Sequence, residues 1–164
     1  MNLLSQDPAV KRLRLSNPIH FLALGFGSGL VAKAPGTFGT LAAVPLYLLM
    51  CHLSLHVYLL LTLFSVVIGV YICDKAAKDM EVHDHGAIVW DEVAGLLITM
   101  IAAPAGWLWL IIGFILFRFF DIIKPWPIRW LDAKVHGGFG IMIDDVLAGV
   151  FAAICLQIAA YTLG

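Results

Sequence analysis

Charged residues occupy only a few short segments of this chain, and the stretches between them are almost entirely apolar. Of its 164 residues, 62% are hydrophobic and 13% are charged. Soluble domains are about 45–50% apolar and about 25% charged, so this composition is typical of a membrane protein. The same figures exclude a disordered chain, a disulfide scaffold and a collagen-like fibre. The net charge of −1 argues against a nucleic-acid-binding protein, which needs a basic surface.

The apolar stretches predict an all-α fold, a compact helical bundle that is integral to the membrane. Ser16-Asn17-Pro18 is typical of a helix start, and the glycine-containing apolar run that follows, over 19–32, is too short to cross a hydrocarbon core of ~30 Å. We therefore predict a short re-entrant or interfacial first helix whose small residues allow close helix packing. About five membrane-embedded helices follow, over 41–51, 57–73, 93–103, 107–120 and 141–163.

The positions of the cations predict the topology. All Lys and Arg lie in the N-terminal arm, at Lys33, in the polar loops over 74–90 and 121–140, or at Arg118 beside the second loop, whereas the links over 52–56 and 104–106 carry none. The positive-inside rule then places every charged segment on the cytoplasmic side. We expect one membrane-embedded domain over 1–164, with residues 1–15 as a polar cytoplasmic arm.

Five carboxylates fall at predicted helix ends that this topology brings to one depth. Asp91 and Glu92 open one helix, Asp121 closes the next, and Asp144 and Asp145 fall in the first turn of the last. Such a cluster at the edge of hydrocarbon is costly unless a cation binds it, and oxygen ligands suit Mg²⁺. The alternative is helix capping, which accounts neither for adjacent acid pairs nor for an acid at a helix C-terminus.

Cations accompany the predicted metal ligands. Arg118, Asp121 and Lys124 recur at i, i+3 and i+6, so they share one helical face, and Arg118 and Lys124 are candidate phosphate-binding residues. Lys33 and Thr37 lie in a glycine-containing loop before an apolar helix, where backbone N–H groups favour an anion. These residues predict a site for a phosphate ester.

Two further residues have competing interpretations. Arg129 lies in the aromatic, basic segment 126–130, where it contacts either the substrate or a lipid headgroup. His85 is either the proton donor to a leaving alkoxide or a residue of a capped polar loop.

Taken together, these motifs resemble the phosphatidylglycerophosphatase A family of bacterial membrane lipid phosphatases. The resemblance covers about residues 15–150, with Thr40 in place of an expected serine. The matching segments include Pro35-Gly-Thr-x-Gly39, Val82-His-Asp-His-Gly86, Ile88-Val-Trp-Asp-Glu92, Phe117-Arg118, Asp121, Lys124-Pro-Trp-Pro-Ile-Arg-Trp130 and Gly140-Ile-Met-Ile-Asp-Asp145.

The resemblance implies Mg²⁺-dependent hydrolysis of phosphatidylglycerophosphate to phosphatidylglycerol and inorganic phosphate. It also implies a multi-pass protein of the bacterial cytoplasmic (inner) membrane with its active site facing the cytoplasm. The expected partner is the membrane phospholipid substrate, with no nucleic acid and no obligate protein partner.

Roles within the site follow from chemistry rather than from the resemblance. We expect Asp91, Glu92, Asp121, Asp144 and Asp145 to bind metal, and Lys33, Thr37, Arg118, Lys124 and Arg129 to bind substrate. The expected catalytic residues are Asp91, Asp145, His85, Lys124 and Arg118. Direct attack by water is the favoured mechanism, with an aspartyl-phosphate intermediate as the alternative. The rival functions are a small cation-coupled transporter that uses the acidic cluster and a non-catalytic lipid-binding subunit.

Overall fold

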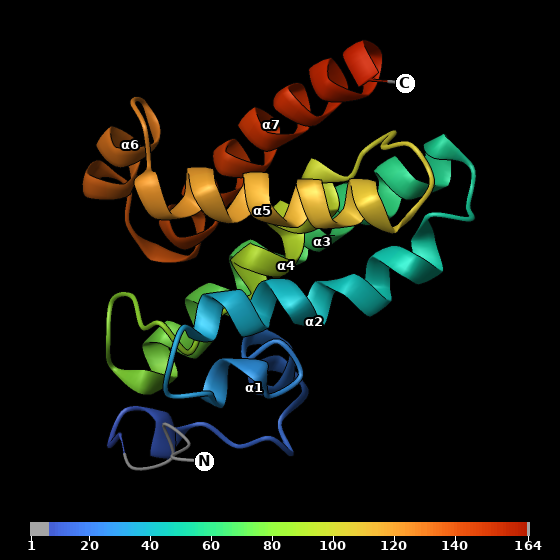
Figure 1. Ribbon diagram of the computed structural model, residues 1–164. Helices are drawn as coiled ribbons and strands as arrows, with labels where there is room; N and C mark the ends of the chain where they lie inside the picture. The colour runs from blue at the N-terminus through green and yellow to red at the C-terminus, as the bar shows by residue number, and fades with distance from the viewer. Residues whose placement is uncertain (1–6, 164) are drawn as a thin grey trace.

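A computed structural model describes residues 7–163, and every regular element in this range is helical (Figure 1). Residues 1–6 of the predicted polar arm lie outside the described range. The helical prediction is confirmed. In chain order the elements are η2 (Val10–Arg12), α1 (Pro18–Ala23), η3 (Ser28–Leu30), α2 (Pro35–Met50), α3 (Leu55–Met80), α4 (Trp90–Thr99), α5 (Trp107–Ile123), α6 (Ile128–Lys134) and α7 (Gly137–Leu163).

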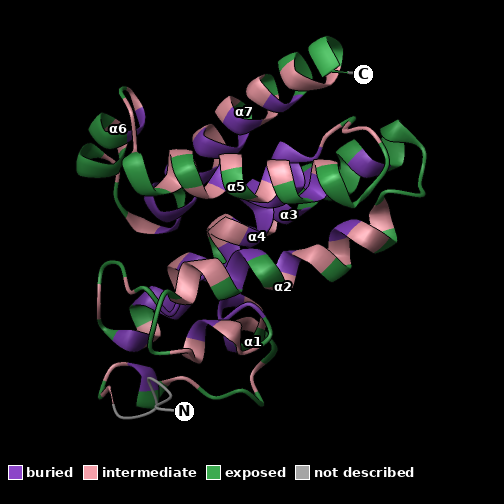
Figure 2. Ribbon diagram, viewed as in Figure 1, coloured by how far each residue is buried: buried purple, intermediate pink, exposed green. Residues whose placement is uncertain are grey.

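The short helix α4 lies at the centre of the fold. Its residues from Val93 to Thr99 are buried, and α2, α3, α5 and α7 all pack against it. Figure 2 shows the buried residues gathered in the middle of the bundle and the exposed ones along its outer faces. At 1.5 Å per residue α4 is about 15 Å long, about half of a ~30 Å hydrocarbon core. It is therefore a core helix and too short to cross a bilayer.

Two glycines allow α4 and α7 to cross at close range. A Cβ atom on Gly149 would lie 2.6 Å from the carbonyl oxygen of Gly95, closer than real Cβ atoms approach. A Cβ atom on Gly95 would overlap the ring of Phe117 from α5. Backbone therefore packs on backbone at this crossing, as in other helix pairs with small residues at their interface.

The hydropathy of the first apolar run predicted one short helix, but the run is divided between α1 and η3. Helix α1 ends at Ala23, because Gly25 and Gly27 adopt positive φ angles of 51° and 91°, which a right-handed helix does not contain. The predicted close packing of the small residues is found. A Cβ atom on Gly29 would overlap the carbonyl group of Ala87 in the loop before α4.

The two longest helices extend into segments predicted to be loops. Helix α3 continues to Met80, and its last turns are supported by ion pairs one turn apart, with Lys78 Nζ 2.6 Å from Asp74 Oδ2. Helix α7 begins at Gly137, and the N–H of Gly138 donates to Asp74 Oδ1 at 3.2 Å. The charged residues over 74–79 thus form the polar end of the apolar helix α3, and the glycines at 137, 138 and 140 belong to the start of α7.

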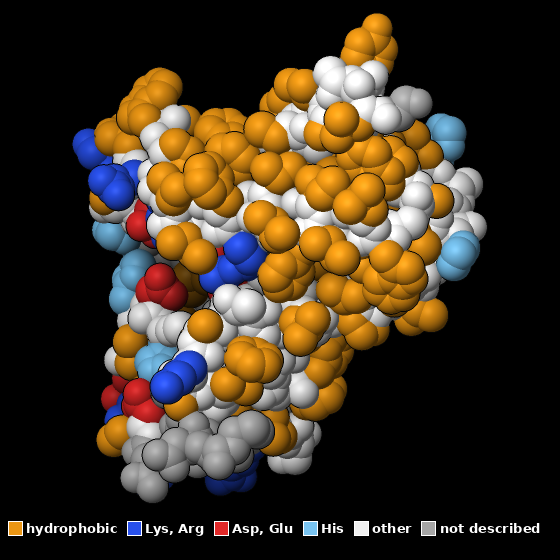
Figure 3. Space-filling model, viewed as in Figure 1, with side chains coloured by type: hydrophobic (Ala, Val, Ile, Leu, Met, Phe, Trp, Pro, Cys, Tyr) orange, Lys and Arg blue, Asp and Glu red, His pale blue; other side chains and the backbone are white. Residues whose placement is uncertain are grey.

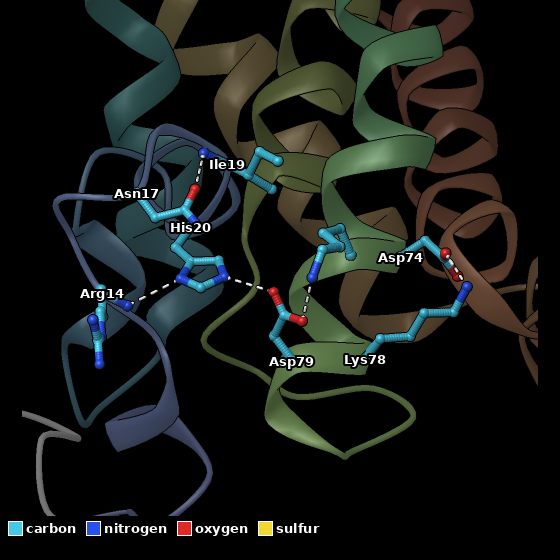
Figure 4. Close-up of polar contacts among 8 residues, drawn as sticks. Arg14, Asn17, Ile19, His20, Asp74, Lys78 and Asp79 are labelled. Atoms are coloured by element: carbon cyan, nitrogen blue, oxygen red, sulfur yellow. Dashed lines mark hydrogen bonds and ion pairs between the residues drawn. The ribbon is translucent and has the colours of Figure 1, made fainter.

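A buried histidine ties the N-terminal segment to α3 (Figure 4). The backbone N–H of Arg14 donates to His20 Nδ1 at 3.0 Å, so the ring hydrogen resides on Nε2, which lies 2.9 Å from Asp79 Oδ2. The His20 side chain is only 6% exposed. This chain of hydrogen bonds fixes α1 against the end of α3.

Two helices of the described chain, α3 and α7, are long and apolar enough to cross a membrane. Their most apolar windows have mean hydropathies of 2.2 and 2.1, yet only 28% and 22% of those windows is buried. The core helix of a soluble protein would be mostly buried, so this exposure favours a lipid-facing surface.

Substituting Gly149 with valine should destabilise the fold, because the added side chain must push α7 away from the Gly95 carbonyl group. Overpacking of this kind costs about 1–3 kcal/mol. We expect a lower midpoint of thermal unfolding in detergent. The neighbouring Val150→Leu, at a position that is 38% exposed, should leave the midpoint unchanged. Equal midpoints for both variants would contradict the packing described here.

Candidate active site

Three carboxylates from two helices converge where α4 and α7 cross. Asp91 and Glu92 lie in the first turn of α4, and Asp145 lies on α7. One oxygen from each carboxylate lies within 4.8 Å of the other two. The crossing at Gly95 and Gly149, one turn away along each helix, holds the two backbones close enough for this approach. The result is a compact, oxygen-only group of the kind that binds hard divalent cations.

The capping interpretation fits only part of this group. Asp91 and Glu92 do occupy the first turn of a helix. Asp144 and Asp145 do not, because α7 begins at Gly137 and the two acids lie about two turns inside it, which corrects their predicted position. Favourable interaction with a helix N-terminus is lost within the first turn, so the burial of these two acids needs another explanation.

The cluster is enclosed and short of hydrogen-bond partners. Four carboxylate oxygens are buried without any partner in the protein: Asp91 Oδ1, Glu92 Oε2, Asp144 Oδ1 and Asp145 Oδ2. Buried carboxylates without partners are costly, and a bound cation removes the cost.

The two other predicted metal ligands already have cationic partners. Asp121, in the last turn of α5, forms an ion pair with Arg118. Lys124, which follows α5, places its Nζ 2.6 Å from Asp144 Oδ2 and 3.0 Å from Asp132 Oδ1. Asp121 and Asp144 therefore lie around the three-acid group, each bound to a cation. Sequence reasoning missed Asp132, which lies in α6, within a segment predicted to be a loop, and has no neighbouring acid in the sequence.

Arg118 lies between the acids and the start of α2. Its Nη1 is 3.9 Å from Glu92 Oε1, and its side chain is 15% exposed. A Cβ atom on Gly36, in the first turn of α2, would collide with both the Glu92 carboxylate and the Arg118 guanidinium. Thr37, next in the chain, is half-buried, whereas Lys33 is exposed before the helix. Gly36 belongs to the motif Pro35-Gly-Thr-x-Gly39, and its lack of a side chain leaves room for the Glu92 carboxylate and the Arg118 guanidinium.

The hydrogen-bond partners of His85 are not the carboxylates of the three-acid group. Its Nε2 lies 3.1 Å from Asp7 Oδ2, and its Nδ1 accepts a hydrogen bond of 3.1 Å from the N–H of Ala87. The hydrogen bond from His85 lowers the pKa of Asp7. This pair connects the N-terminal arm to the loop before α4, so the capped-loop interpretation describes the contacts that His85 makes.

Arg129 is exposed beside the acid cluster. Together with residues that include Lys124, Trp126 and Trp130, it lines an open cavity of 480 Å³. Lys124 therefore lines the cavity and also binds Asp144 beside the acid cluster. Figure 3 shows basic and acidic side chains, with some of the histidines, on the left of this face, other histidines at its right edge and a broad apolar surface between them.

Sequence comparisons assign this arrangement to a known family. The model of the phosphatidylglycerophosphatase A family matches residues 21–160. Phosphatidylglycerophosphatase A of Escherichia coli K12 is 55% identical over 149 residues, which are 90% of this chain and 87% of that protein. The enzyme of the same name from Haemophilus influenzae Rd is 48% identical over 96% of this chain and 98% of its own length.

A more distant relative also carries a lipid phosphatase name. The putative phosphatidylinositol-3-phosphatase of Bacteroides thetaiotaomicron is 36% identical over 87% of this chain and 94% of its own. No solved structure matches the chain. The extent of the family match and the identities to the two phosphatidylglycerophosphatases show that this chain belongs to the phosphatidylglycerophosphatase A family.

Proposed function

We propose that this protein removes the terminal phosphate of phosphatidylglycerophosphate, giving phosphatidylglycerol and inorganic phosphate during phospholipid biosynthesis. The names of the relatives from Escherichia coli and Haemophilus influenzae support this substrate. The structural observation that carries the proposal is the group formed by Asp91, Glu92 and Asp145, whose buried oxygens lack partners and which Arg118 flanks. A phosphate monoester needs such an arrangement of cation ligands and guanidinium.

The residues of the site suit Mg²⁺. Asp91, Glu92 and Asp145 would hold it, since each offers a carboxylate oxygen and the oxygens lie within 4.8 Å of one another. Asp121, paired with Arg118, and Asp144, paired with Lys124, would add negative charge around the bound ion. The bound ion would draw electrons from the phosphoryl group and make water a stronger nucleophile.

The cations of the site have distinct roles in this proposal. Arg118 binds phosphoryl oxygens, because its guanidinium already lies within 3.9 Å of Glu92 and matches the geometry of a phosphate. Lys124 orients Asp144 and balances the charge of the incoming phosphate. Lys33, Thr37 and Arg129 line the approach to the site and bind the rest of the headgroup.

In the reaction, water attacks phosphorus and the bond from phosphorus to the glycerol oxygen breaks. The water loses its proton to a carboxylate of the cluster, and we assign this role to Asp145 on α7. The leaving glycerol oxygen gains a proton. His85 is the second proton carrier in the proposal, and it serves there only after its hydrogen bond to Asp7 opens. Asp91 belongs to the same group and would be the nucleophile if a phosphoenzyme formed.

We further propose that α2, α3, α4, α5 and α7 are embedded in the bacterial cytoplasmic membrane with the acid cluster at the inner leaflet. The links over 52–56 and 104–106 carry no Asp, Glu, Lys or Arg, whereas the ends of α3, α5 and α7 near the cluster carry many. This asymmetry satisfies the positive-inside rule with the site facing the cytoplasm. It also disfavours the transporter, which would need polar positions along a path to the outer side.

Replacing Asp145 with asparagine should lower phosphate release from phosphatidylglycerophosphate at least about a hundredfold, equal to about 2.7 kcal/mol at 1.36 kcal/mol per factor of ten. The amide keeps the shape of the side chain but loses a charge from the cluster. The matched control is Glu81→Gln, since the Glu81 side chain is 73% exposed and pairs with Arg12 of the N-terminal segment, outside the site. A full rate for Asp145→Asn would remove the proposed site.

Removal of divalent cations should abolish the activity of the purified protein. We expect loss of phosphate release in excess EDTA and its recovery when Mg²⁺ is added in excess over the chelator. Asp91→Asn should raise the Mg²⁺ concentration needed for half-maximal rate, because one of the three ligands is weakened. Unchanged turnover in EDTA would show that the carboxylates serve another purpose.

Oxygen-18 water and acid quenching together distinguish the two mechanisms in a single turnover with enzyme in excess. Direct attack places the label in the phosphate released by that first turnover. An aspartyl-phosphate forms by carboxylate attack, and its later hydrolysis at phosphorus would also label the phosphate, whereas attack at the carboxyl carbon would label the enzyme instead. We therefore pair the measurement with acid quenching, and we expect labelled phosphate and no acid-stable phosphoenzyme.

A further inference from the structure

An apolar furrow lies between α2 and α5 and runs toward the end of α2 and the start of α5. Both helices pack on α4, and the space between them is a cavity of 240 Å³. Only hydrophobic side chains line this cavity: Leu41, Val44, Trp107, Leu110, Ile111, Phe114 and Ile115. A second cavity, of 320 Å³, continues it past Trp107 and Leu110, which line both, to Tyr47, Leu48 and the polar side chain of His52 near the end of α2.

The furrow lies on the same helix faces as the site. On α2, Leu41, Val44 and Leu48 follow Thr37 at four, seven and eleven positions, the spacing of one helical face. On α5, Ile115 and Ile111 precede Arg118 at three and seven positions and share its face in the same way. The polar end of the furrow is therefore where Gly36 meets Arg118 and Glu92.

The length of the furrow matches one leaflet of a bilayer. From Arg118 to Trp107 the axis of α5 measures about 16 Å at 1.5 Å per residue. Half of a hydrocarbon core of ~30 Å is about 15 Å, which is the depth that the acyl chain of a lipid occupies. The furrow has charged groups at one end and apolar walls along the rest. This polarity matches a phospholipid, in which a single acyl chain extends below a charged headgroup.

We propose that the α2–α5 furrow binds one acyl chain of the lipid substrate while its phosphate lies at the acid cluster. This inference rests on the proposed function and adds to it the path of the chain and a preference for long chains. The furrow is too narrow for a protein partner, because a helix with its side chains is about 10–12 Å across and the cavities hold only a few hundred cubic ångströms.

A bulky side chain partway along the furrow should shorten the acyl chain that the furrow can bind. Ile111 lies midway along it and is 54% exposed, so tryptophan can be accommodated there without disturbing the core. For Ile111→Trp we expect the KM for a phosphatidylglycerophosphate with palmitoyl chains to rise about tenfold, equal to about 1.4 kcal/mol of binding. The KM for the hexanoyl lipid, whose chains end before Ile111, should not change.

The matched control is Leu63→Trp on α3. Leu63 is 59% exposed and lies outside the cavities described above, so this variant should keep the wild-type KM for both lipids. Both variants are first compared with wild type for their midpoint of thermal unfolding in detergent. The furrow is refuted if Ile111→Trp impairs both chain lengths equally, or if Leu63→Trp impairs the palmitoyl lipid as strongly.

A binding measurement tests the furrow without relying on turnover. A phosphatidylglycerophosphate with a photoreactive diazirine near the end of one palmitoyl chain is irradiated with wild-type protein in micelles. We expect crosslinks at Tyr47, Trp107 and Leu110, suppressed by unlabelled palmitoyl lipid. Crosslinks spread evenly over the exposed faces of α3 and α7 would overturn the inference but leave the proposed function intact. Absence of phosphate release from wild type would instead refute the function.

Discussion

The close crossing of α4 and α7 is the constraint on which the rest of this structure depends. Gly95 and Gly149 allow the two backbones to touch, and one turn away the same approach brings Asp91 and Glu92 to Asp145. A larger residue at either glycine would separate the carboxylates along with the helices. Packing and chemistry are therefore determined by one contact, and the site cannot be moved without rearranging the core.

The electrostatics of the site follow from this geometry. The acids are drawn together by packing and not by mutual attraction, so their charge must be balanced from outside the crossing. Arg118 and Lys124 supply part of that balance from α5 and the residue after it, through Asp121 and Asp144. Four buried carboxylate oxygens remain without a partner in the described protein, so these two residues balance only part of the negative charge. Membership in a phosphatase family agrees with a site built in this way.

The sequence predicted the fold class and the acids of the site better than it predicted where the helices begin and end. Apolar runs predicted an all-helical fold, and the acids predicted to lie at one depth include the three that meet. The end of α3 was misplaced because its last turns carry charged residues, which hydropathy alone assigns to a loop. The start of α7 was misplaced because Gly137, Gly138 and Gly140 are typical of a turn. Ion pairs such as Asp74 with Lys78 supply the missing stability. The bond between His85 and Asp7 joins residues 78 positions apart, and no local pattern announces such a contact.

The exposed side of α5 has a consequence for how a lipid would reach the enzyme. Ile111 and Ile115 are both more than half exposed, so the furrow opens sideways and not only toward the headgroups. A phospholipid could slide in from the surrounding leaflet while its tails remain in hydrocarbon. Extraction into water, at about 0.8 kcal/mol for each methylene, would never be required. The dephosphorylated lipid could then diffuse away in two dimensions, and only phosphate would leave for the aqueous phase.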